Sequence, residues 1–277
     1  MLSAGRFALL VLWAAHAMAA PGVWRASIEE ASAEARAANK PLLVDFRADW
    51  CAPCKVMEKD VYTSAFFAAV APRLVPVQID FDKQRGLARK YRVEALPTIV
   101  FTDSYGTELF HFSGYIGPKT MEGLLAALPS DIGEFNRLGR VLAADPHNVE
   151  ALGAMGHDLR EAGLFLTSNE YYARAMARAD RPAREAMLDE TGRNYLDLKQ
   201  AREAAAVFEK CLKEFPSSAR TEGWTIALAQ AWAAQEKPER ARKVLDTYLA
   251  AHADAPDVAA ARAALLNGSL NHDGIGR

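Results

Sequence analysis

Two cysteines separated by two residues, Cys51 and Cys54, constrain this sequence more than any other feature. An apolar run at 41–46 precedes them, and a helical pattern begins at Lys55. This order predicts a buried strand that delivers Cys51 to the N-terminus of a helix, where the helix dipole and free backbone N–H groups favour thiolate over thiol. Cys54 follows one turn later, close enough to bond to Cys51. The spacing therefore predicts a dithiol that can be oxidised and reduced without unfolding the chain.

The rest of the sequence disfavours a structural role for this cysteine pair. A zinc site needs four ligands, and the only other cysteine, Cys211, lies far away in a different kind of sequence. A purely structural disulfide across so few residues would constrain little, because loop-closure stabilisation grows with loop length. The histidines show no metal-ligand spacing either. We therefore expect a redox dithiol, with no metal site and no cofactor.

The segment 45–55, Asp-Phe-Arg-Ala-Asp-Trp-Cys-Ala-Pro-Cys-Lys, resembles the active-site segment of the thioredoxin superfamily. The resemblance continues over residues 40–128. Met57-Glu58-Lys59 is also similar to the C-terminal periplasmic domain of DsbD-type transmembrane reductases. The resemblance implies an α/β thioredoxin-like domain and thiol–disulfide oxidoreductase activity, with Cys51 and Cys54 as the redox-active disulfide.

Asp45 is a carboxylate inside an apolar run, 42–46, of the kind found in central strands covered on both faces. The resemblance implies an aspartate buried behind the dithiol that helps to move the proton of Cys54. Burial would raise its pKa towards the range useful for proton exchange. The alternative is a side chain that faces a loop or water. We expect Asp45 to be the general acid/base that assists Cys54.

The second family signature is Ala95-Leu96-Pro97-Thr98, in which a proline begins a predicted strand. Proline cannot donate to the hydrogen-bond ladder of a sheet. The resemblance implies a cis proline against the dithiol, preceded by a residue whose backbone pairs with an extended substrate; an ordinary trans proline is the alternative. The expected substrate-binding residues are Trp50, Pro53, Leu96, Pro97 and Gly114.

Three positions depart from the thioredoxin pattern. Thioredoxins usually have tryptophan where this chain has Arg47 and glycine where it has Ala52, and the lysine that often neighbours the buried aspartate is replaced by Pro76. A positive Arg47 near the site could lower a thiol pKa, or could be solvated. These departures affect the expected pKa values and reduction potential, and leave the expected chemistry unchanged.

Hydrophobic runs and turn signals predict a mixed sheet flanked by helices in the N-terminal half. A capping box, Ser27 with Glu30, opens a helix that ends near Ala38. The other predicted helices are an active-site helix at 53–70, a loop and helix at 80–91 and a last helix at 117–128. The predicted strands are 42–46, 74–79, 98–101 and 109–112.

The first residues have the pattern of a secretory signal peptide. Arg6 supplies the positive charge, 7–15 is apolar, and Ala17-Met18-Ala19 fits the cleavage pattern. An uncleaved anchor is the alternative, but the apolar run is short for a bilayer, which needs about 20 residues. We therefore expect cleavage after Ala19 and export, which in a bacterium means the periplasm, with no stable membrane insertion after cleavage.

The second half of the sequence predicts an all-α domain. Small and large apolar residues recur with a period of about 34 residues, which resembles the tetratricopeptide repeat; a generic helical bundle is the alternative. Cys211 falls at a small buried position of such a repeat and is interpreted as packing. The predicted division is a signal peptide at 1–19, a thioredoxin-like domain at 20–129, a linker at 130–133, tetratricopeptide-like repeats at 134–266 and a flexible tail at 267–277.

Together these features favour an exported thiol–disulfide oxidoreductase. Ala-Pro between the cysteines and the DsbD-like flanks resemble reducing members of the family, which implies a reductase of protein disulfides. A disulfide oxidase or isomerase, and a non-catalytic adaptor or chaperone, are the alternatives. The expected partners are protein disulfide substrates, a DsbD-type membrane electron donor and a protein bound to the repeats. The net charge of −2 gives no reason to expect nucleic acid as a partner.

Overall fold

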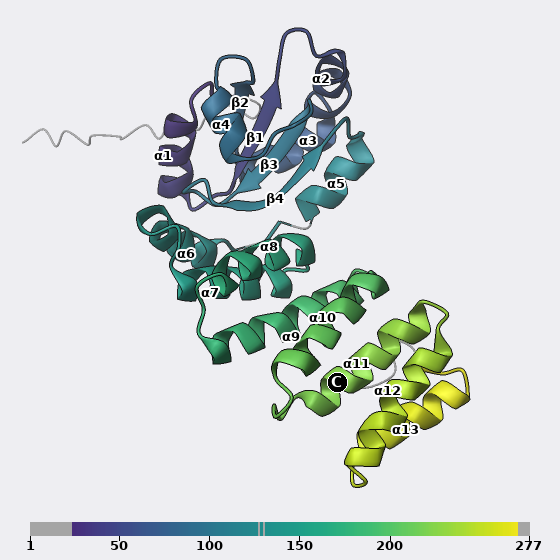
Figure 1. Ribbon diagram of the computed structural model, residues 1–277. Helices are drawn as coiled ribbons and strands as arrows, with labels where there is room; N and C mark the ends of the chain where they lie inside the picture. The colour runs from purple at the N-terminus through teal and green to yellow at the C-terminus, as the bar shows by residue number, and fades with distance from the viewer. Residues whose placement is uncertain (1–23, 127, 130, 271–277) are drawn as a thin grey trace, which may run out of the picture.

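The computed structural model of the protein describes residues 24–126, 128–129 and 131–270. Figure 1 shows an α/β domain at one end of the molecule, from which successive helices extend to the C-terminal end. The predicted signal peptide at 1–19 lies outside the described residues, as do residues 271–277 of the predicted tail. Leu270, within that tail, is buried against the last helices.

A mixed four-stranded sheet forms the centre of the α/β domain, as predicted. Its strands are β1 (Leu42–Arg47), β2 (Val75–Asp80), β3 (Thr98–Thr102) and β4 (Glu108–Ser113), in the order β2-β1-β3-β4. β1 runs parallel to β2 and antiparallel to β3, and β3 runs antiparallel to β4. The end of β1 that leads to the cysteines therefore lies beside the start of β3, and the turn after β3 lies at the opposite end of the sheet.

Helices cover both faces of this sheet (Figure 1). On one face, residues of α1 (Ile28–Ala38) and of α4 (Arg85–Lys90) pack against Leu42, Val44 and Val77. On the other face, α3 (Ala65–Val70) and α5 (Pro118–Ala126) pack against the sheet in a separate apolar cluster. The Ser27 hydroxyl accepts a hydrogen bond from the Glu30 N–H, which confirms the predicted cap of α1.

The single active-site helix predicted at 53–70 is wrong. The structure has three elements there: α2 (Ala52–Met57), a π-helical turn η1 (Glu58–Tyr62), and α3. The chain leaves the helical conformation at Ser64, whose side chain accepts a hydrogen bond from the Phe67 N–H at 3.1 Å and so caps α3. An N-capping serine inside an apolar helical pattern starts a new helix. The strand ends differ from the prediction by at most one residue.

The repeat domain consists of helices that pack in consecutive antiparallel pairs. Its helices are α6 (Gly133–Ala144), α7 (Val149–Glu161), α8 (Phe165–Met176), α9 (Arg181–Asp197), α10 (Ala201–Glu214), α11 (Thr221–Ala234), α12 (Pro238–Ala251) and α13 (Pro256–Leu266). Gly156 of α7 lies against the ring of Tyr172 of α8, and Gly192 of α9 lies against the ring of Phe208 of α10. The same small-against-aromatic contact in successive pairs confirms the predicted repeat architecture.

Cys211 lies fully buried in α10, within the apolar core of the repeats. Burial raises the pKa of its thiol to about 12. A protonated, inaccessible thiol is unreactive, which agrees with the interpretation of Cys211 as a packing residue. Among the described residues, no helix combines the length and apolar character needed to cross a bilayer.

The two domains share one apolar core. The cluster that contains α3 and α5 continues without interruption through Phe135 and Leu138 of α6 into α7 and α8. Polar contacts reinforce this joint: the Tyr171 hydroxyl donates to the Glu108 carbonyl at 2.9 Å, and Arg92 pairs with Glu170 at 2.7 Å. The repeats therefore have a fixed orientation relative to the sheet.

Gly139→Ala is expected to destabilise this joint. A Cβ on Gly139 of α6 would overlap the Asp103 carboxylate, which cannot swing away without losing the hydrogen bonds that its other oxygen accepts from the Tyr105 and Thr107 N–H groups. We expect the free energy of unfolding in urea to fall by about 2 kcal/mol. The matched control is Gly123→Ala in α5, where no atom lies within 4 Å of the new Cβ. This control is expected to gain about 0.5 kcal/mol, and equal effects of the two changes would contradict the interpretation.

Candidate active site

Cys51 and Cys54 form a disulfide at the N-terminus of α2, as their spacing predicts. Cys51 is the N-cap of the helix, and the Cys54 N–H points at the Cys51 Sγ at 3.1 Å. An amide hydrogen and the positive end of the helix both stabilise a negative sulfur. After reduction, Cys51 is therefore the cysteine whose thiolate the backbone favours. Both side chains are almost inaccessible, at 2% and 3% exposure.

Asp45 lies buried in the middle of β1, only 2% exposed. Burial raises the pKa of its carboxyl from 3.8 to about 7, and the opposing effects of Arg47, Tyr62 and Gln78 do not restore the ordinary value. Gln78 Nε2 donates a hydrogen bond to its Oδ2 at 3.4 Å, and its Oδ1 has no partner within hydrogen-bond distance among the described residues. The structure confirms that the Asp45 carboxyl is buried, and its role in proton transfer stays a prediction.

Arg47 takes part in an ion pair rather than lying free in solvent. Its guanidinium contacts the Glu58 carboxylate at 2.9 Å, which links β1 to the π-helical turn that follows α2. Arg47 favours the ionised form of Asp45, and Glu58 opposes it. The pair therefore places two opposite charges beside the buried carboxyl, so that neither acts on it alone.

Leu96 lies beside the cysteines, and the next residue, Pro97, is joined to Gly114 by a hydrogen bond. The bond between Leu96 and Pro97 is cis, as the resemblance implies. Leu96 packs against the cluster of Ala48, Cys51 and Cys54, and the Gly114 N–H donates to the Pro97 carbonyl at 2.7 Å. Gly114 has a φ of +98°, which only glycine adopts easily. The structure thus brings Leu96 to the cysteines and joins Gly114 to Pro97, and the role of these residues in binding substrate stays a prediction.

Trp50 precedes Cys51, Pro53 precedes Cys54, and both side chains are exposed. The Trp50 indole is 66% exposed, and its Nε1–H donates to Asp82 at 2.7 Å. Among the described residues, the exposed large hydrophobic side chains are Trp50, Val56, Tyr115, Leu166 and Leu266. Three of these five lie within a few residues of a cysteine or of Gly114. An exposed apolar rim around a disulfide fits contact with a protein substrate.

Sequence reasoning missed two residues of this site, Tyr62 and Gln78. Gln78 could have been found, because side chains two apart on a strand share a face and Pro76 was already placed beside Asp45. Tyr62 carried no such signal, since its position depends on the π-helical turn. The amide of Gln78, rather than a lysine, is the polar group that the second strand brings to Asp45.

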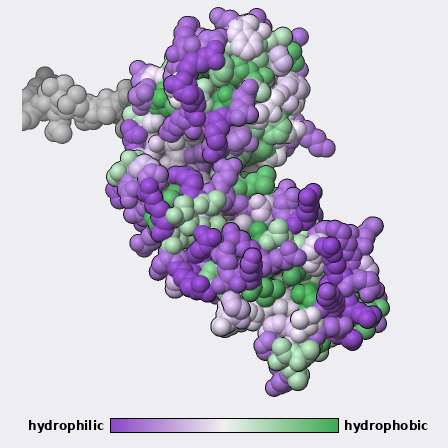
Figure 2. Space-filling view, in the orientation of Figure 1, coloured by the Kyte–Doolittle hydropathy of each residue, from purple (hydrophilic) through white to green (hydrophobic). Residues whose placement is uncertain are grey.

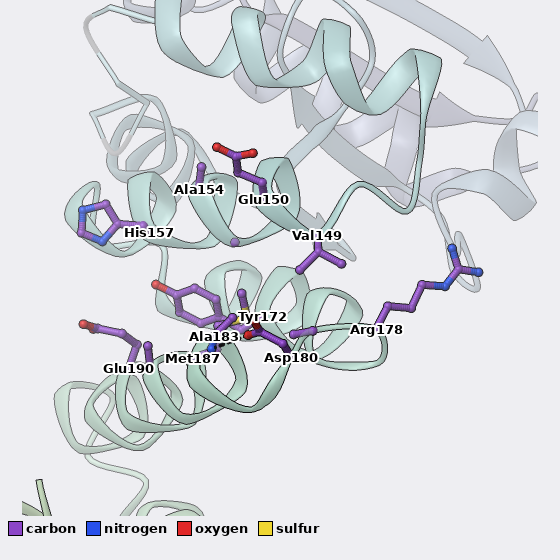
Figure 3. Close-up of a pocket in the computed structure, with 13 residues that line it drawn as sticks. Val149, Glu150, Ala154, His157, Tyr172, Arg178, Asp180, Ala183, Met187 and Glu190 are labelled. Carbon is purple, nitrogen blue, oxygen red and sulfur yellow. Dashed lines mark hydrogen bonds between the residues drawn. The ribbon is translucent and has the colours of Figure 1, made fainter. Parts of the chain in front are cut away.

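A second candidate site lies on the repeats, between α7 and α9. It is an open, mainly apolar pocket of about 800 Å³. Figure 3 shows Tyr172 between the two helices, the carboxylates of Glu150 and Glu190 near the rim, and Arg178 extending away from the pocket. The molecular face seen in Figure 2 is mostly hydrophilic, with hydrophobic patches on both domains. The repeats thus present an apolar recess edged by acidic groups.

Comparison with known proteins places both halves of the chain. Residues 23–104 match a family model described as thioredoxin-like, and residues 195–265 match a tetratricopeptide repeat. Thioredoxin-1 of Drosophila yakuba is 38% identical over 76 residues, which are 27% of this chain and 68% of the relative. The chain belongs to the thioredoxin family. The mixed sheet and the cysteine pair of the described residues agree with this family.

Other relatives match a smaller share of their own length. Thiol:disulfide interchange protein DsbD 1 of Pseudomonas aeruginosa is 38% identical over 97 residues, which are 32% of this chain but only 16% of that protein. The Oryza sativa thioredoxin H-type is 37% identical over 68 residues, 24% of this chain and 53% of the relative. Among solved structures, a thioredoxin from Thermus thermophilus has 25% identity and a TM-score of 0.35, and covers 38% of this chain and 85% of its own.

Proposed function

We propose that this protein is an exported thiol–disulfide oxidoreductase that reduces disulfides in protein substrates. The observation that carries the proposal is the disulfide of Cys51 and Cys54 at a helix N-terminus, with a buried Asp45 in the strand that leads to it. Leu96 beside the cysteines and the exposed Trp50 supply a backbone and an apolar surface for an incoming polypeptide.

In the first step, the Cys51 thiolate attacks one sulfur of the substrate disulfide. The substrate S–S bond breaks, a mixed disulfide forms between Cys51 and that sulfur, and the other substrate sulfur leaves as a thiolate that takes a proton. The Cys54 N–H and the start of α2 stabilise the Cys51 thiolate before the attack.

In the second step, Cys54 releases the substrate. Its thiol gives a proton to Asp45, the sulfur attacks Cys51 Sγ, and the bond between Cys51 and the substrate breaks. The substrate sulfur leaves Cys51 as a thiolate and takes back the proton held by Asp45, so the substrate departs as a dithiol and the Cys51–Cys54 disulfide carries the two oxidising equivalents. A carboxyl with a pKa of about 7 is half ionised near neutral pH, which suits it to both accept and return a proton.

Export and the reducing direction rest on sequence. The pattern of residues 1–19 supports export, and the similarity of residues around the dithiol to a DsbD-type protein supports a reductase. In an oxidising compartment the disulfide needs a source of electrons, for which we propose a membrane donor of the DsbD type. The pocket between α7 and α9 is our proposed binding surface for a protein partner.

The reduction potential of the Cys51–Cys54 couple tests the direction. It is measured on the mature protein by equilibration with glutathione buffers. A value of about −270 to −220 mV, in the range of thioredoxin, supports a reductase, whereas a value near about −120 mV makes the protein an oxidant and overturns the proposed direction. If the protein does not catalyse the reduction of insulin disulfides, whichever of the two potentials is found, the result would favour the adaptor alternative.

A further inference from the structure

Two buried polar atoms of this site have no hydrogen-bond partner among the described residues: Tyr62 Oη and Asp45 Oδ1. Buried polar atoms in folded proteins are nearly always paired, and an exception calls for a physical reason. Both exceptions occur in the same small region, on the strand that leads to Cys51 and at the end of the turn that follows α2. A common cause is therefore more economical than two separate ones.

The position of Tyr62 is set by its ring and by the π-helical turn. The ring packs against Trp24, with centroids 4.7 Å apart, and against Phe67, at 5.1 Å. Tyr62 is the last residue of η1, and π turns inside helices are frequent at functional sites. The aromatic contacts hold the ring in place, which leaves the hydroxyl as the part of the side chain without a packing role.

The ion pair of Arg47 on β1 with Glu58 on η1, at 2.9 Å, holds η1 beside the strand that contains Asp45, so the Tyr62 hydroxyl at the end of η1 and the Asp45 carboxyl share one buried region. The hydroxyl lowers the pKa of Asp45, although burial has the larger effect and raises it. Burial, and then the negative charge of Asp45, raise the pKa of the Tyr62 phenol well above its ordinary value. Tyr62 therefore remains protonated at every pH at which the dithiol works, so it can serve only as a donor towards the carboxylate.

We propose that Tyr62 is a positioning residue whose hydroxyl donates a hydrogen bond to Asp45 when this carboxyl is ionised. The inference rests on the proposed function for one point, that Asp45 accepts the Cys54 proton. Before the transfer, the bond from Tyr62 stabilises the carboxylate in its apolar pocket. After it, the proton resides on Asp45, the electron pair stays on the Cys54 sulfur, and the Tyr62 bond is released.

Three other groups face Asp45, and each remains when Tyr62 is changed. Gln78 on β2 donates its weak hydrogen bond, Arg47 on β1 favours the carboxylate, and Glu58 on η1 opposes it. Tyr62→Phe keeps the ring against Trp24 and Phe67 and removes only the oxygen. The matched control is Tyr105→Phe, in the turn between β3 and β4 at the opposite end of the sheet.

The direct test is the pKa of Asp45, followed by carboxyl ¹³C NMR titration of the oxidised and reduced protein. In Tyr62→Phe the carboxylate loses a donor, so the pKa is expected to rise by about one unit, and Tyr105→Phe is expected to leave it unchanged. An unchanged or lowered Asp45 pKa in Tyr62→Phe would overturn the inference. This titration needs no enzymatic activity, so it tests the hydrogen bond from Tyr62 to Asp45 even if the proposed function fails.

The pH profile of disulfide exchange gives a second readout. Below its pKa, less of Asp45 is ionised in Tyr62→Phe, so the exchange rate near pH 6 is expected to fall up to about tenfold and the profile to shift to higher pH. In an Asp45→Asn background the same change is expected to have no further effect. A merely structural role would lower the rate equally in both backgrounds, which would contradict the inference.

Discussion

Cys54→Ser is expected to leave the protein covalently attached to its substrate. Cys51 remains the N-cap of α2, and the backbone N–H of residue 54 still points at its sulfur, so the attack of Cys51 on a substrate disulfide proceeds. A serine hydroxyl is not a nucleophile towards the resulting mixed disulfide at neutral pH. Turnover is therefore expected to fall at least about a thousandfold while the mixed disulfide accumulates.

Non-reducing electrophoresis and mass spectrometry of the adducts check this result. The matched control is Cys51→Ser, which removes the attacking thiol and is expected to form no adduct. Cys211→Ser controls for the third thiol, which is buried and expected to be silent. Equal adduct formation by Cys51→Ser and Cys54→Ser would contradict the assignment of Cys51 as nucleophile. Full rescue of a deletion phenotype by a variant that carries both Cys51→Ser and Cys54→Ser would support an adaptor that needs no thiol.

The parts of this site that could be predicted from sequence are those set by local pattern. Cys51 and Cys54 lie one helical turn apart by spacing alone, and the apolar run around Asp45 implies burial on a central strand. The mixed sheet and the all-α second half follow from hydrophobic periodicity. In each of these cases a few consecutive residues contain the information that fixes the structure.

The parts that could not be predicted depend on contacts between distant segments. The 53–70 helix was wrong because periodicity does not reveal a π turn or the restart at Ser64. The ion pair of Arg47 with Glu58 depends on how η1 returns towards β1, so the sequence, which left Arg47 open between lowering a thiol pKa and being solvated, contained no sign of it. The shared core that joins α6 to the sheet likewise has no local signal.

Asp45→Asn is expected to stabilise the oxidised protein increasingly as pH rises. The Asp45 pKa is about 7 in the folded state, against an unfolded value near 3.8. Between these values the folded protein binds one proton more than the unfolded chain, so this group lowers the free energy of unfolding as pH rises from about 4 to about 7. Asparagine does not titrate and removes this loss. The free energy of unfolding of the variant is expected to exceed that of the wild type by little at pH 4 and by on the order of 4 kcal/mol at pH 8.

Urea unfolding of both proteins with the disulfide intact measures this gain at a series of pH values. Asp103 also has a pKa raised by burial, to about 6, so the wild type and the variant share part of their pH dependence. The informative quantity is therefore the difference between the free energies of unfolding of the two proteins at each pH, because the contributions of groups that both proteins share cancel in it. Asp49→Asn, an exposed aspartate in the same segment, is the matched control. A gain that is flat across pH, or equal in both variants, would show that burial of Asp45 does not set its ionisation, and the same measurement would then remove the basis for its part in proton transfer.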